Sequence, residues 1–149
     1  MEKIVKRIGL VYYMIYTSTI LSTVVGYLLT MNSDEHLDSK SELGIALKSI
    51  IILYTLISLP LALGGFFRMT KKWIAIEDET EKFNQYKKGA IIRLSLIGTG
   101  LIASIIVFYL FRTDISLIYC AGISAIALLF CKPSEAKMIN ELHLDKSEE

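Results

Sequence analysis

The chain has 149 residues, of which 53% are hydrophobic and 21% are charged, and its net charge is +1. A charge so close to neutral gives no bulk attraction to nucleic acid. Charged residues are almost absent from four long segments, and this argues against a soluble helical protein, in which even a buried helix keeps a polar face.

The first apolar segment covers residues 8–31 and follows a basic N-terminal stretch. About 20 helical residues are needed to cross a hydrocarbon core of about 30 Å. The segment is too long for the core of a signal peptide, and no A-x-A-like cleavage site follows it, so we expect a retained transmembrane helix. Its small residues at four-residue spacing are typical of a helix-packing face: Ser18, Ser22 and Gly26.

The second apolar segment covers residues 44–67 and follows a short acidic connection. We interpret Lys48, close to its start, as a charge at the membrane interface, because a long basic side chain can reach the headgroups. Pro60 removes one backbone hydrogen bond and favours a kink. Together with Gly64 and Gly65 it would form either a static kink or a gate, and the sequence leaves both open.

The connection 68–88 is the largest polar part of the chain. Its acidic block resembles a helix start with a capping box near Asp78, which predicts one helix from there to Phe111 whose first turns stand outside the membrane. Exposed rings on this extension need cover, from the preceding stretch, from the C-terminal tail or from a partner protein. Phe83 and Tyr86 on this extension, with Trp73 after the second span, are candidates for a cytoplasmic interaction. Trp73 is alternatively an anchor at the membrane interface.

The third span is expected over residues 89–111. Arg93 lies one turn inside it, and we expect its side chain to extend to the interface. Gly98 and Gly100 are candidates for a close helix contact. Gly89 costs helix stability relative to alanine, so we expect Gly89→Ala to be tolerated or stabilising.

The fourth span is expected over residues 115–131, with Ala121 and Ala125 as packing residues, and a cytoplasmic tail follows over 132–149. The two cysteines lie too far apart on this helix to form a disulfide, so we expect free thiols at Cys120 and Cys131. Residues 135–144 predict a short amphipathic helix. Its apolar face is expected to hold Ala136, Ile139, Leu142 and His143.

Orientation follows from the basic residues, which concentrate in cytoplasmic segments. All but three of the 16 lysines and arginines fall before the first span, in or next to the middle connection, or after the fourth; the exceptions are Lys40, Lys48 and Arg112. The fold class is therefore expected to be all-α: an integral membrane antiparallel four-helix bundle with a cytoplasmic extension of the third helix. Both termini would lie on the cytoplasmic side of the plasma membrane, the inner membrane of a two-membrane cell.

No motif for catalysis, metal binding or cofactor binding is found in the sequence. No acid or histidine lies at the middle of a span, where proton-coupled carriers need one, and His36 on the acidic connection is a poor metal-ligand set by itself. We therefore expect a non-enzymatic polytopic membrane protein without cofactor or metal. It would act in the lipid bilayer through a protein partner or homo-oligomerisation; the alternative is an oligomeric small-solute channel or carrier.

Overall fold

The computed structural model describes residues 1–33, 38, 40–111 and 115–144. Within these residues the chain forms five helices and no strand. Three of the helices are long and apolar enough to cross a membrane. The helices are α1 (Glu2–Asn32), α2 (Glu42–Ile74), α3 (Glu79–Phe111), α4 (Ile115–Phe130) and α5 (Glu135–Glu141).

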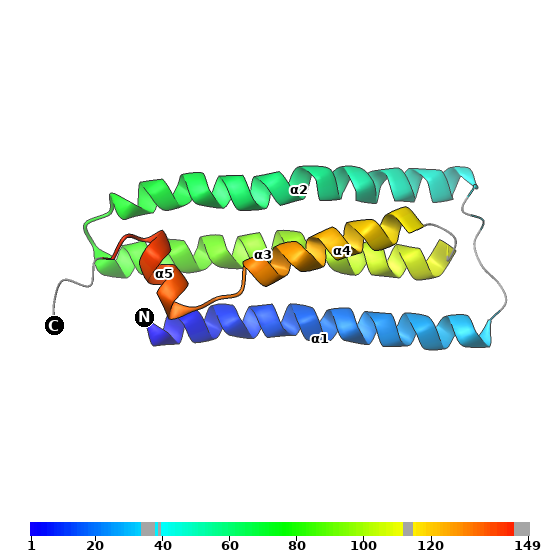
Figure 1. The fold of residues 1–149 in the computed structure, drawn as a ribbon, viewed down its shortest axis with the longest axis horizontal. Helices are drawn as coiled ribbons and strands as arrows, with labels where there is room; N and C mark the ends of the chain where they lie inside the picture. Colours follow the sequence, from blue (N-terminus) through cyan, green and yellow to red (C-terminus); the bar gives the residue numbers. More distant parts are fainter. Residues whose placement is uncertain (34–37, 39, 112–114, 145–149) are drawn as a thin grey trace.

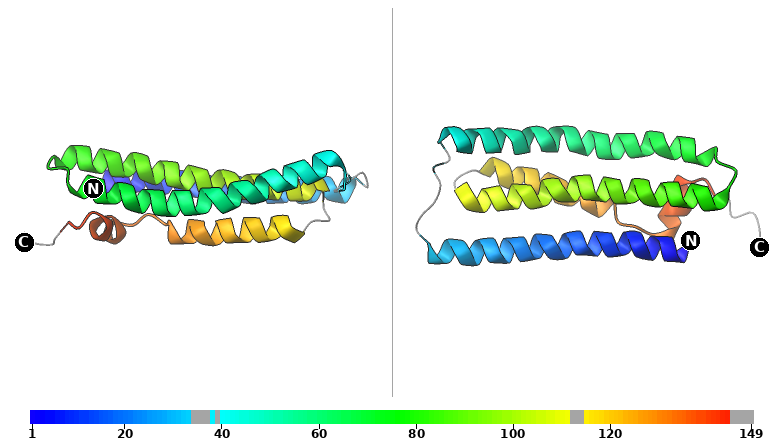
Figure 2. Two further views of the ribbon diagram at one scale, coloured as in Figure 1. Left: turned by 90° about the horizontal axis from the view of Figure 1, so that it is seen from above. Right: turned by 180° about the vertical axis from the view of Figure 1, so that it is seen from behind.

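Helix α3 occupies the centre of the molecule, with α1 and α2 on its two sides (Figure 1). Helix α4 lies on one face of this three-helix layer and contacts both α3 and α2. Figure 2 shows α4 and α5 on the same side of the layer. The first four helices run alternately along the long axis, and α5 crosses one end of the molecule.

The core follows from the sequence of α3. Its inward face carries residues that are almost completely buried, among them Leu94, Ile97 and Ser104. The hydroxyl of Ser104 donates to the carbonyl oxygen of Gly100 at 2.7 Å, so a polar group is buried at little cost. At the helix start the Thr80 amide donates to Asp78 Oδ1 at 3.0 Å. The prediction of one helix from near Asp78 to Phe111 is confirmed.

Helix α2 continues through Pro60 without a break and extends to Ile74. Its N-terminus is capped by Ser41, whose hydroxyl oxygen accepts from the Gly44 amide at 3.1 Å. A Cβ added to Gly64 or Gly65 would have no neighbour within 4 Å. These two glycines therefore do not mediate a close contact between the described helices.

Helices α4 and α5 meet at an angle of 85°. Helix α4 has 16 residues and is about 24 Å long at 1.5 Å per residue. Within α5 and the two residues after it, Met138 and Leu142 are buried, while Ala136 and His143 are exposed. The predicted apolar face of this tail helix is thus wrong at two positions, because the face that packs is centred on Met138.

Candidate functional site

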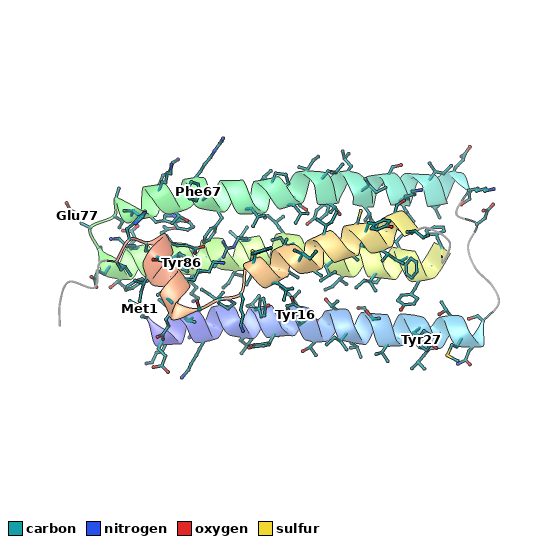
Figure 3. The ribbon with its side chains drawn as sticks, in the orientation of Figure 1. Met1, Tyr16, Tyr27, Phe67, Glu77 and Tyr86 are labelled. Atoms are coloured by element: carbon teal, nitrogen blue, oxygen red, sulfur yellow. The ribbon has the colours of Figure 1, made fainter. Side chains whose placement is uncertain are left out.

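Polar and aromatic side chains gather at the end of the molecule where most of the lysines and arginines lie. We call it the basic end. It holds Met1, the connection between α2 and α3, and helix α5 (Figure 3). Three rings form its centre: the centroid of Phe66 lies 5.5 Å from that of Trp73 and 5.6 Å from that of Tyr86. Both pairs are edge-to-face, the geometry that the ring quadrupole favours. We call Phe66, Trp73 and Tyr86 the aromatic cluster.

The aromatic cluster joins α2 to α3 because Gly89 of α3 has no side chain where the Trp73 ring of α2 lies. An added Cβ on Gly89 would lie 2.1 Å from Cη2 of Trp73. Trp73 is buried and packed among the other rings, so the indole cannot move aside freely. The geometry therefore argues against the sequence-based expectation for Gly89→Ala: helix propensity favours alanine, but the indole occupies the space that its methyl group needs.

Arg93 places a positive charge beside the aromatic cluster. Its guanidinium carbon lies 3.7 Å from the centroid of the Phe66 ring, a cation–π contact. Its Nη1 lies 3.7 Å from Oε1 of Glu141, an ion pair in which the two side chains are 8% and 23% exposed. Its Nε is buried and has no hydrogen-bond partner among the residues that the structure describes. Arg93 is thus held inside the chain, whereas the sequence analysis predicted that its side chain extends to the membrane interface.

Tyr86 contacts the same carboxylate. Its hydroxyl donates to Oε2 of Glu141 at 2.6 Å, so each oxygen of this carboxylate has a partner from α3. Tyr86 precedes the span expected over residues 89–111. Burial, followed by the hydrogen bond to Glu141, raises the pKa of its phenol well above the ordinary value of 10.0. The phenol therefore stays a neutral hydrogen-bond donor over the physiological pH range.

The contacts of Glu141 attach α5 to the centre of the molecule. We call the group formed by Tyr86, Arg93 and Glu141 the α5 clasp. Beneath it Met138, Leu142 and Cys131 are almost completely buried, and the Ser134 hydroxyl oxygen accepts from the Lys137 amide at 3.2 Å at the start of α5. The arrangement can hold a short helix in place through buried apolar area and one shared carboxylate.

The candidate interaction residues lie mostly inside the chain. Trp73 and Tyr86 are buried, and Phe83 is half-buried and packed against the core. The sequence left three possible covers for these rings: the preceding stretch, the C-terminal tail or a partner protein. In the structure the C-terminal tail covers Tyr86, and the end of α2 lies beside it. Lys48, a candidate interface charge, is half-buried near the opposite end.

Candidate packing residues differ in what they meet. A Cβ added to Gly26 would lie 2.4 Å from the Tyr109 ring. A Cβ added to Gly98 would lie 2.8 Å from Ile15, and one added to Gly100 would lie 3.1 Å from Tyr54. These glycines therefore lie at contacts of α3 with its two flanking helices. Ala121 and Ala125 pack against the core and Ser22 is half-buried, whereas Ser18 is exposed.

Glu141 and Phe66 were missed as site residues by the sequence analysis. A glutamate in a polar tail and a phenylalanine in an apolar span carry no signal of their own, because the folding of the tail onto α3 brings Glu141 to Arg93 and the packing of α2 against α3 brings Phe66 there. Both predicted free thiols are confirmed. Among the residues that the structure describes, no group of three or more His, Cys, Asp or Glu side chains has the arrangement of a metal site.

Comparisons with protein-family models, with curated proteins and with solved structures found no match.

Proposed function

We propose that this chain is a non-enzymatic membrane protein that acts by binding a protein partner or a second copy of itself. It would cross the plasma membrane four times, with both termini and the basic end in the cytoplasm. The observation that carries this proposal is the α5 clasp. The most elaborate polar arrangement of the described residues serves to hold a helix in place, and it leaves no side chain positioned for a reaction on a substrate.

The hydroxyl groups within the long helices support the same proposal. Those of Thr17 and Thr23 donate to backbone carbonyl oxygens four residues earlier in α1, and Thr55 and Thr70 do so in α2. Thr17 and Thr23 are exposed on the outside of the molecule. Because these hydroxyls are bonded within their own helices, they are poorly suited to line a solute path between copies of the chain, and this favours a dry scaffold over the oligomeric channel or carrier alternative.

Four crossings require α4 to serve as the fourth span. Its length of about 24 Å is less than the hydrocarbon thickness of about 30 Å, but its residues include no charge. Lys132 lies two residues after the end of α4 and is exposed. A short apolar helix with a basic residue at its end is accommodated by local thinning and by extension of the lysine to the headgroups.

Site-specific photo-crosslinking in cells tests the binding function. The reactive residue replaces Leu28 on the exposed side of α1, or Lys72 at the basic end, both of which are exposed. We expect a discrete adduct, of twice the chain mass or with one defined second protein, from at least one position. Ile97, which is completely buried, is the matched control and should give no intermolecular adduct.

The proposal would be overturned by a chain that gives no adduct from either exposed position and is monomeric by light scattering in detergent. It would equally be overturned by solute flux through liposomes that contain the purified chain, because a dry scaffold conducts nothing.

A further inference from the structure

An open groove of about 760 Å³ runs along the first half of α1 at the basic end. One wall is α1 itself, and the other is the connection from α4 to α5, with Pro133 nearest to Gly9. Lys6 and Lys132 lie at the groove, one from each wall. The connection passes close to the start of α1 in Figure 1.

The groove changes character along α1. Leu10 and Met14 line it beyond Lys6 and are 60% and 59% exposed. Met14 lies eight residues after Lys6, which is about 12 Å along the helix. Thr17 also lines the groove, but its hydroxyl is bonded to the carbonyl oxygen of Tyr13. The groove is thus basic at one end and apolar beyond it.

The two lysines are available to a ligand. Lys6 Nζ lies 2.6 Å from Glu2 Oε1, but both side chains are at least 70% exposed, and such a solvated pair is weak. Lys132 is exposed. Lys137, the next lysine along the chain, contacts the carbonyl oxygen of Phe130. The positive charge at the groove therefore comes from Lys6 and Lys132, with the Glu2 carboxylate as the opposing charge.

We infer that this groove binds one anionic phospholipid, with the phosphate between Lys6 and Lys132 and an acyl chain along Leu10 and Met14. The inference rests on the membrane location proposed above. Basic pockets between membrane helices on the cytoplasmic side bind anionic headgroups. A phospholipid fits the charge and the apolar wall together, whereas an acidic peptide would leave the apolar wall uncovered.

The test uses the full chain purified in detergent and native mass spectrometry, titrated with phosphatidylglycerol or phosphatidylcholine. Lys6→Gln/Lys132→Gln should weaken phosphatidylglycerol binding by about 30-fold, at about five-fold for each basic residue near the surface. Phosphatidylcholine binding should change little. The matched control Lys72→Gln/Lys88→Gln removes two exposed lysines of the same end outside the groove and should leave binding unchanged.

A second pair of variants tests the acyl chain. Gly9→Leu should project a side chain into the groove, since an added Cβ meets only Pro133, at 3.9 Å. It should displace the lipid while both lysines remain. Gly64→Leu adds the same side chain where nothing lies within 4 Å and should leave binding unchanged. Unaltered Trp73 fluorescence and melting temperature show that the variants are folded.

Three results would overturn the inference. In the first, Lys72→Gln/Lys88→Gln weakens phosphatidylglycerol binding as much as Lys6→Gln/Lys132→Gln does. In the second, Gly9→Leu binds phosphatidylglycerol as the unchanged chain does. In the third, soluble glycerol phosphate competes as well as the lipid. These results are distinct from failure of the proposed function. A chain that stays in membranes and forms the expected adducts, yet fails here, loses the lipid site alone.

Discussion

Gly89 shows how a single missing side chain sets the geometry of the basic end. The indole of Trp73 fills the space beside Gly89, and the same ring lies edge-on to Phe66 and Tyr86. Packed interiors have little free volume, so an added methyl group displaces a ring that is itself held by others. The position therefore depends on tertiary contact more than on helix propensity.

We predict that Gly89→Ala destabilises the protein by about 1 kcal/mol, since overpacking costs about 1–3 kcal/mol and the gain in helix propensity returns about 1 kcal/mol. The melting temperature in detergent should fall, and the emission of Trp73, the sole tryptophan, should shift.

Gly64→Ala is the control, because its Cβ meets nothing within 4 Å, and it should be neutral or stabilising. The double variant Gly89→Ala/Trp73→Phe should recover part of the loss, since the smaller ring leaves room for the methyl group. An unchanged melting temperature for Gly89→Ala alone would contradict this packing.

At the scale of elements, α5 depends on others for its position. A helix of seven residues is too short to be stable by itself in water. Its buried residue Met138, together with Leu142, supplies the apolar contact, and Glu141 supplies the polar one. Loss of the carboxylate charge leaves Arg93 buried without its counter-charge, which is unfavourable.

We predict that Glu141→Gln loosens α5 and uncovers Cys131, which is 1% exposed in the intact protein. In a Cys120→Ser background, the rate of thiol labelling at Cys131 should rise by about ten-fold or more, for a local loss of about 1.5 kcal/mol or more. Hydrogen exchange of the α5 amides should accelerate in parallel.

Glu135→Gln removes an exposed carboxylate from the first turn of the same helix and serves as the control for the clasp. Its labelling rate should stay near that of the unchanged chain. If both variants label at one rate, the contacts of Glu141 do not hold α5.

Over the whole molecule, burial is uneven. Helix α1 has two buried residues, Ile8 and Tyr12, both near its start. Helix α3 has buried residues along most of its length. The C-terminal half of α1 therefore presents apolar side chains to its surroundings, as a helix in lipid does.

The proposed four-span arrangement makes a prediction about labelling on intact cells. In a background without Cys120 and Cys131, a cysteine in place of Ser33 should react with an impermeant thiol reagent. Cysteines in place of Glu77 and Glu135 should react after permeabilisation alone. All three positions are exposed, so access depends on the side of the membrane. Labelling at Glu135→Cys on intact cells would contradict four spans.

The sequence by itself determined the helical class, the long third helix and the distribution of basic residues, because each depends on local pattern. Runs of uncharged residues specify helices of membrane length, and the capping residues at Asp78 specify where α3 begins. The sequence also indicated that Gly98 and Gly100 would lie at helix contacts, since small residues permit close approach.

Only the tertiary structure decided which residues meet at the basic end. Glu141 lies 48 positions after Arg93 in the sequence, and their ion pair forms because α4 returns the chain along α3 and the connection turns α5 across its end. The buried face of α5 follows from the same docking, and the expected cost of a methyl group at Gly89 follows from the packing of α2 against α3. Helical periodicity cannot predict which neighbour a face will meet, because that depends on the shape of the surface it packs against.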